Sequence, residues 1–107
     1  MEIGGDINST DGTEPAWAHT RAEFEKPRRE YFLRGYETWL MQEARQRQPQ
    51  LILESLQWGA PYWIGNGQFW SQDNADYLAT FHEILRREFK LPIGLQGLWN
   101  ETAFDTE

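Results

Sequence analysis

Apolar residues recur at helical spacing over residues 28–48, and this pattern predicts an amphipathic helix. Pro49 ends the predicted helix, because proline lacks a backbone donor and clashes with the preceding turn. Gly35 inside it costs about 1 kcal/mol relative to alanine, so we expect this glycine to mark close packing. The residues expected along the apolar stripe are Leu33, Tyr36, Leu40 and Ala44, flanked by Phe32 and Trp39.

A second helical pattern covers residues 74–89. Ser71 or Asp73 stands where an N-cap is needed, since either side chain can accept a hydrogen bond from the first turn. Leu91 and Pro92 end the pattern. The expected apolar face of this helix consists of Leu78, Phe81, Leu85 and Phe89.

Three short apolar runs, at residues 1–3, 51–56 and 91–98, are typical of strands. Strands then alternate with helices along the chain, an order that predicts parallel βαβ units and the α/β fold class. Residues 1–20, which are rich in Gly, Asp, Ser and Thr, are expected to form a long polar loop. The pattern alone does not separate an open parallel sheet from a closed barrel.

The length of the chain bears on that choice. A (β/α)8 barrel needs eight βα units and ~250 residues, whereas the 107 residues here hold the ends of three strands and two long helices. Parallel strands are normally covered on both faces and paired at both edges. We therefore expect residues 1–107 to be one segment of a larger domain, and to be only marginally stable alone.

The composition excludes several classes of function. With a net charge of −7 the chain lacks a basic surface, so no nucleic-acid partner is expected. No apolar run approaches the ~18 residues of a membrane helix, so no transmembrane segment is expected. The absence of cysteine excludes disulfides and thiolate metal sites, and two distant histidines argue against zinc. We expect neither a metal nor a cofactor.

Aromatic residues are unusually frequent, with six Trp, four Tyr and six Phe. Such side chains fill protein cores, and their faces also stack on the C–H face of a sugar ring. Trp58 comes just after the strand at 51–56, a place that favours the rim of a pocket. For Trp63 and Trp70 we expect core packing, with a lipid-facing aromatic rim as the alternative. His82 is expected to pack against the core or to lie at the surface.

Trp99-Asn100-Glu101 stands where the strand at 91–98 ends. Catalytic groups of (β/α)8 barrels lie at the carboxyl ends of the strands, and barrel glycosidases place an acid/base carboxylate there beside an Asn. Retaining hydrolysis of a glycoside needs two carboxyl groups about 5–5.5 Å apart, one of them protonated. Glu101 is the candidate for the protonated group, and neither Asp105 nor Glu107 is an obvious partner for it.

Four stretches of the chain form an ordered set, at residues 2–6, 10–15, 35–44 and 97–101. Together they closely resemble family 59 of the glycoside hydrolases, the galactocerebrosidase family. The Thr-Asp-Gly-Thr-Glu-Pro run at residues 10–15 is the specific signal, since many barrel glycosidases end their fourth strand in Asn-Glu. The resemblance implies a partial (β/α)8 TIM barrel, from the end of its second strand through its fourth, so that residues 1–107 are a fragment of the catalytic domain.

The resemblance also implies a retaining β-galactosidase whose substrate is a galactosyl lipid of the galactosylceramide type or another β-galactoside. Glu101 matches the acid/base of the family, and Asn100 matches the residue that contacts the sugar 2-hydroxyl. Thr10 and Trp58 match positions that line the galactose pocket. The nucleophile belongs to a later strand, so this segment alone is expected to be inactive. A lysosomal or secreted enzyme is implied, although no targeting segment is recognisable in the chain.

The chain departs from the family pattern in three places. Thr102 follows Glu101 where a basic residue is expected, and Gln57 precedes Trp58 where proline is expected. The segment 21–29 is also longer and more charged. These departures bear on the exact substrate more than on the fold. Two alternatives stay open: another barrel glycosidase of the same clan, acting on glucosylceramide or xylosides, and a non-catalytic carbohydrate-binding remnant.

Overall fold

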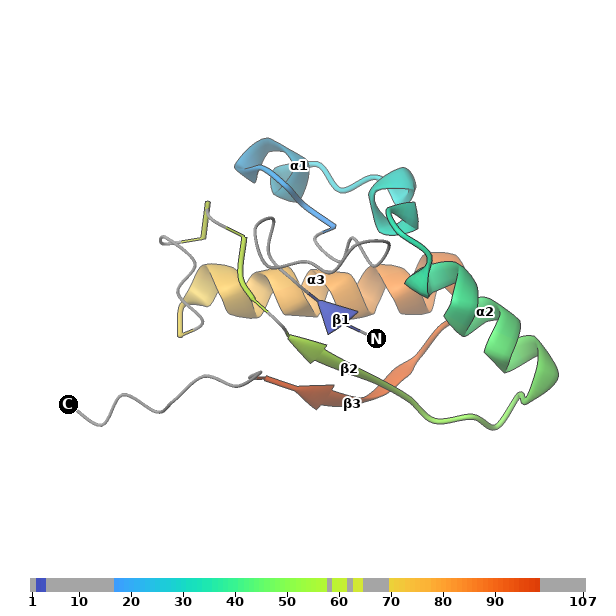
Figure 1. The fold of residues 1–107 in the computed structure, drawn as a ribbon. Helices are drawn as coiled ribbons and strands as arrows, with labels where there is room; N and C mark the ends of the chain where they lie inside the picture. Colours follow the sequence, from blue (N-terminus) through green and yellow to red (C-terminus); the bar gives the residue numbers. More distant parts are fainter. Residues whose placement is uncertain (1, 4–16, 58, 62, 65–69, 99–107) are drawn as a thin grey trace.

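The computed structural model describes residues 2–3, 17–57, 59–61, 63–64 and 70–98. The elements along the chain are β1 Glu2–Ile3, α1 Arg21–Glu25, the 3-10 helix η1 Arg29–Leu33, α2 Glu37–Arg47, β2 Leu53–Gln57, α3 Gln72–Phe89 and β3 Ile93–Gly97. Within the described residues the three strands form one parallel sheet in the order β1-β2-β3, and α3 connects β2 to β3 (Figure 1). The predicted parallel βαβ arrangement and α/β class are thereby confirmed.

The strands are held in a fixed parallel register. β1 pairs with the carboxyl half of β2, with Glu2 opposite Leu56. β2 pairs with β3, and an irregularity after Leu53 places Gly94 as one extra residue in β3. Gly97 lies opposite Leu56, and a Cβ atom added to this glycine would come within 2.6 Å of Leu56 Cδ1. Glycine at this position therefore leaves room for the leucine side chain.

Helix α3 matches the helix predicted at 74–89 but begins earlier, at Gln72. Ser71 is its N-cap, since the hydroxyl oxygen accepts a hydrogen bond from the Asn74 N–H at 3.2 Å. Lys90, with φ at 56°, adopts the left-handed conformation that commonly ends a helix. All four residues of the predicted apolar face are buried in the core, so that prediction is confirmed.

The continuous helix predicted over 28–48 is wrong, because the chain breaks between η1 and α2. Gly35 lies in the break with φ at 66°, a left-handed conformation that glycine adopts without steric penalty. This glycine is exposed, so its backbone freedom explains its presence, and the expectation of close packing is also wrong. The break directs the Arg34 guanidinium to Glu23, at a distance of 2.7 Å.

The apolar stripe predicted for the same segment is wrong as well. Leu33, Tyr36 and Leu40 are exposed, whereas Phe32 and Met41 are buried in the core. The break changes the phase between the two helical pieces, so one helical period does not describe both of them. The exposed apolar surface of this region consists of Leu33, Tyr36, Trp39 and Leu40.

Trp17 lies in the middle of an aromatic core. Its side chain is 2% exposed and stacks on Phe32 and Tyr77, with ring centroids 5.1 and 5.4 Å away. Its indole N–H donates to the Tyr77 carbonyl at 3.2 Å. Trp63 donates to the Ala18 carbonyl at 2.9 Å and packs against the same core, which confirms the packing expected for it. These contacts join the segment before α1 to η1 and α3.

The two faces of the sheet differ in burial. Leu53, Ser55 and Gln57 of β2 are buried on the side of α3. On the opposite side the cross-strand neighbours Glu54 and Leu95 are exposed. Two of the three buried positions of β2 are therefore polar, and both lie toward its carboxyl end.

Candidate functional site

Four residues of the predicted site lie outside the described residues: Thr10, Trp58, Asn100 and Glu101. Two of their described chain neighbours lie at strand ends. Gln57 is the last residue of β2, and Leu98 directly follows β3. The described part of the candidate site is therefore built from these strand ends and from the beginning of α3.

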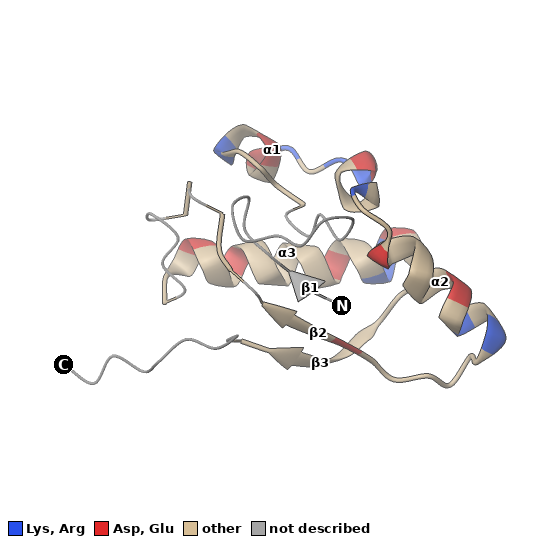
Figure 2. Ribbon diagram, viewed as in Figure 1, with Lys and Arg blue, Asp and Glu red and all other residues tan. Residues whose placement is uncertain are grey.

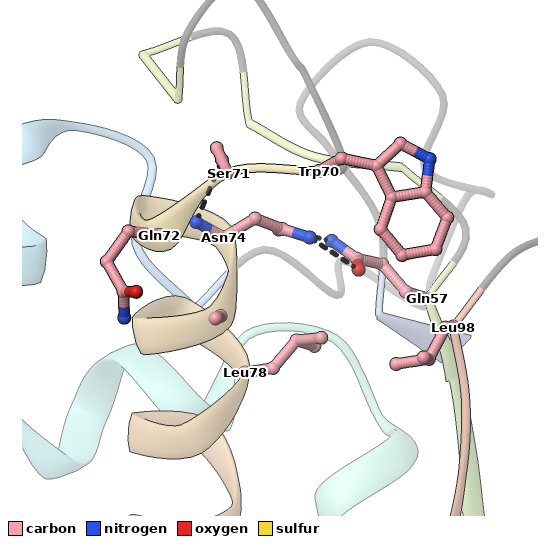
Figure 3. Close-up of a pocket in the computed structure, with 8 residues that line it drawn as sticks. Gln57, Trp70, Ser71, Gln72, Asn74, Leu78 and Leu98 are labelled. Atoms are coloured by element: carbon pink, nitrogen blue, oxygen red, sulfur yellow. Dashed lines mark hydrogen bonds between the residues drawn. The ribbon is translucent and has the colours of Figure 1, made fainter.

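A cavity of about 440 Å³ opens at the carboxyl ends of β2 and β3 (Figure 3). This is the end of the strands at which ligands and catalytic groups gather in parallel α/β folds. The lining residues that the structure describes carry no charge. The residues that line the cavity are Gln57, Trp70, Ser71, Gln72, Asn74, Ala75, Leu78 and Leu98.

Gln57 and Asn74 form a buried amide pair in the wall of this cavity. Gln57 Nε2 donates to Asn74 Oδ1 at 2.6 Å, and Asn74 Nδ2 donates back to Gln57 Oε1 at 3.0 Å. Gln57 Nε2 also donates to the Gly59 carbonyl at 3.3 Å. Buried amides are costly without partners, and here they satisfy one another. Gln57, at which the chain departs from the family pattern, is thus one of the two residues that form the pair.

Trp70 lines the cavity with a side chain that is 66% exposed, so the core packing expected for it is wrong. It directly precedes Ser71, the N-cap of α3. Leu98, which is 50% exposed, lines the same cavity. An exposed indole and an exposed leucine beside a cavity offer apolar surface to a ligand.

Ser55, Gln96 and His82 form a second polar cluster near the strand ends. Ser55 Oγ donates to Gln96 Oε1 at 2.5 Å, and His82 Nε2 lies 2.6 Å from the same oxygen. In the tautomer protonated at Nε2, His82 donates to this oxygen. His82 is half-buried in this cluster, in keeping with the expectation that it packs. The cluster ties β2, β3 and α3 together beside the cavity.

Comparison with known proteins places this chain in a family. The family model described as "Glycosyl hydrolase family 59" matches residues 1–107, the whole length of the chain. The chain belongs to glycosyl hydrolase family 59. The resemblance read from the four ordered stretches of sequence is thereby confirmed.

Relatives of this family 59 chain include galactocerebrosidases of vertebrates. The chain is 41% identical to that of Danio rerio, 43% to that of Canis lupus familiaris and 39% to that of Homo sapiens, each over 109 residues. These alignments cover 98% of this chain. The chain spans only 15–16% of the length of these curated relatives.

An ion pair fixes the segment before α1 in this family 59 chain. Arg34 donates two hydrogen bonds to the Glu23 carboxylate, at 2.7 and 2.9 Å, and a third to the Trp17 carbonyl at 3.2 Å. The His19 backbone N–H donates to Glu23 at 2.8 Å. The bonds from Arg34, more than that from His19, lower the pKa of the Glu23 carboxyl to about 2, against the opposing effect of burial. The pair thus holds Trp17, and with it the aromatic core, in place.

The charged residues that the structure describes lie mainly on the helices (Figure 2). Among the described residues, no group of three or more His, Asp and Glu side chains could hold a metal ion. In the same part of the chain, no helix is both long and apolar enough to cross a membrane.

Proposed function

We propose that the protein containing this chain is a retaining β-galactosidase that hydrolyses galactosylceramide-type glycosphingolipids, and that residues 1–107 are part of its (β/α)8 catalytic barrel. The observation that carries the proposal is the cavity at the carboxyl ends of β2 and β3. In this family 59 chain Leu98, which lines the cavity, directly precedes Trp99-Asn100-Glu101 in the sequence. The name galactocerebrosidase, which three vertebrate relatives carry, supports the choice of substrate.

Uncovered surfaces of the structure support a larger domain. Glu54 and Leu95 are exposed on the sheet face opposite α3. In a closed barrel this face lines the interior, where side chains from the other strands fill the space. The exposed apolar surface around α2, which includes Trp39 and Leu40, would pack against neighbouring helices of the outer ring.

Glu101 is the general acid that protonates the leaving oxygen, and it then activates the water that releases the sugar. The nucleophile is a second carboxylate about 5–5.5 Å away, on a strand that follows residue 107. Asn100 bonds the sugar 2-hydroxyl, and Thr10 and Trp58 line the galactose pocket. Without the nucleophile, residues 1–107 alone have no meaningful turnover.

The apolar wall of the cavity suits the lipid part of the substrate. The amides of Gln57 and Asn74 bond to each other, so Trp70 and Leu98 supply the exposed surface of the wall. Burying such apolar surface against a hydrocarbon chain is favourable, by roughly 25 cal/mol for each Å² removed from water.

The experiment is a comparison of leaving groups in the protein expressed at its native length. Glu101→Gln removes the acid, so hydrolysis of galactosylceramide, which has a poor leaving group, should fall about 10²–10⁴-fold. An aryl galactoside with a good leaving group should lose much less in the step that forms the glycosyl-enzyme. Glu83→Gln, at an exposed carboxylate paired with Arg87 on α3, is the matched control and should retain activity.

Three outcomes would contradict this interpretation. Equal losses for good and poor leaving groups would remove Glu101 from the role of acid. Faster hydrolysis of β-glucosides or β-xylosides by the unchanged protein would favour another glycosidase of the same clan. Galactose binding without any turnover would favour the non-catalytic remnant.

A further inference from the structure

We propose that Gln57 and Asn74 are positioning residues, which fix the backbone on both sides of Trp58 and so set the affinity of the site for the sugar. The inference rests on the proposed function, because Trp58 is assigned there to the galactose pocket. It adds to that function a pair of buried amides whose side chains hydrogen-bond to each other. The two side chains are 0% and 3% exposed.

The carboxamide of Gln57 hydrogen-bonds to two parts of the chain, the side chain of Asn74 and the backbone of Gly59. Its Nε2 donates one hydrogen bond to Asn74 Oδ1 at 2.6 Å and another to the Gly59 carbonyl at 3.3 Å. The backbone of Gln57 belongs to β2, while Gly59 is two residues further along the chain. One side chain therefore ties the residue before Trp58 to the residue after it.

Asn74 anchors this arrangement to α3. Its Nδ2 returns a hydrogen bond to Gln57 Oε1 at 3.0 Å, and its own backbone N–H donates to the Ser71 hydroxyl at 3.2 Å (Figure 3). Residues 58–70 lie between the end of β2 and the cap of α3, and the amide pair joins those two elements. The pair therefore holds the end of β2 against the first turn of α3.

The chemistry of two amides explains why such a pair positions rather than merely fills space. Each carboxamide donates and accepts, so the two groups bond in one relative orientation, which an apolar pair of the same size would not impose. A sugar-stacking ring contributes more to affinity when it is held in place before the ligand arrives. Loss of the pair should thus weaken substrate binding while leaving the chemical step intact.

The test uses the protein at its native length and measures KM and kcat for a soluble β-galactoside. Asn74→Asp is nearly isosteric and keeps an acceptor for Gln57 Nε2, but it loses the donor to Gln57 Oε1. Gln57→Leu removes the pair entirely. We expect KM to rise about 3-fold in the first variant and about 10-fold in the second, with kcat within about 2-fold of the parent.

Two further variants separate positioning from general weakening of the fold. Thr38→Val removes the buried hydrogen bond from Thr38 Oγ1 to the Phe32 carbonyl, which is 2.7 Å long and lies outside the cavity lining, and KM should not change. In a Trp58→Ala background, Gln57→Leu should raise KM by less than about 2-fold, because its effect passes through Trp58.

The outcomes distinguish the inference from the function on which it rests. An active parent whose KM is unaltered by Asn74→Asp and Gln57→Leu would overturn the inference and leave the proposed function standing. The same follows if Gln57→Leu raises KM equally with and without Trp58. If Gln57→Leu does not fold, Asn74→Asp alone decides. A parent with no action on any β-galactoside would overturn both.

Discussion

Replacing Glu23 by glutamine should weaken the folded state in a way that depends on pH. Arg34 donates hydrogen bonds to both oxygens of the Glu23 carboxylate, and the His19 N–H donates to one of them. Glu23→Gln keeps the size of the side chain but removes its negative charge. The substitution therefore tests the ion pair with little change in packing.

The size of the effect follows from the pKa. A glutamate in an unfolded chain has a pKa of about 4.3, whereas the pKa of Glu23 in the folded protein is lowered to about 2. The full difference corresponds to about 3 kcal/mol of stability at neutral pH. The Arg34 and Glu23 side chains are 23% and 22% exposed, so solvent screens their attraction. We expect Glu23→Gln to lower the free energy of unfolding by about 1–2 kcal/mol at neutral pH.

The sign of the pH dependence is fixed by the direction of the shift. Because the folded pKa lies below the unfolded one, the pair stabilises fully above about pH 5 and loses its effect as the pH falls toward 2. The free energies of unfolding of the parent and the variant, each expressed at its native length, are measured by urea denaturation with tryptophan fluorescence as the signal. The measurements are made at neutral pH and near pH 3. The difference between them should shrink as the pH falls.

The matched control is Glu43→Gln. Glu43 pairs with Arg47 at 2.7 Å on α2, but the side chains are 32% and 74% exposed. Such a pair contributes about 0.5 kcal/mol or less. A loss of unfolding free energy in Glu23→Gln that stays constant with pH would contradict a stabilising role of the ion pair. So would a loss no larger than that of Glu43→Gln at neutral pH.

Two more predictions concern β3 and the extent of the domain. A Cβ added at Gly97 would come within 2.6 Å of Leu56 Cδ1, so Gly97→Ala should lower the free energy of unfolding by about 1 kcal/mol. At Gly94 the nearest atom to an added Cβ is 3.4 Å away, so the free energy of unfolding of Gly94→Ala should lie within about 0.5 kcal/mol of that of the parent. Equal urea midpoints for the two variants would contradict the role given to Gly97. The intact mass of the protein in its native source should be several times 12.7 kDa, and a mass equal to that of these 107 residues would contradict the barrel.

Helices were predictable from the sequence only where one period ran unbroken. The apolar face of α3 repeats without interruption from Leu78 to Phe89, so Phe81 and Phe89 fall on the buried side as expected. The segment 28–48 has a comparable pattern, but Gly35 adopts a left-handed backbone conformation that interrupts the helix. The ion pair of Arg34 with Glu23 stabilises this break. That pair joins residues eleven apart, which no local pattern reveals.

The end of the sheet at which the cavity opens was predictable, but the wall of the cavity was not. Alternation of strands and helices places Gln57 and Leu98 at the same edge of a parallel sheet. The bond between Gln57 and Asn74 depends on how α3 docks, and its partners are seventeen residues apart. Trp70 illustrates a second difficulty, because tryptophan is equally suited to a core and to a ligand surface. The N-cap at Ser71 was the available signal, since it fixes which residues lie at the start of α3.

The buried side of β2 changes from apolar to polar along the strand, and this change explains where the cavity lies. Leu53 joins the core, while Ser55 and Gln57 bond to polar partners on β3 and α3. α3 runs in the opposite direction and shows the reverse order, from Asn74 at its start to Phe89 at its end. Apolar burial is non-directional and stabilises the fold, whereas paired amides impose orientation. The carboxyl ends of the strands, where the cavity opens, are thus held by hydrogen bonds, which define a geometry. The opposite ends are held by apolar packing, as in barrels, where that end serves stability.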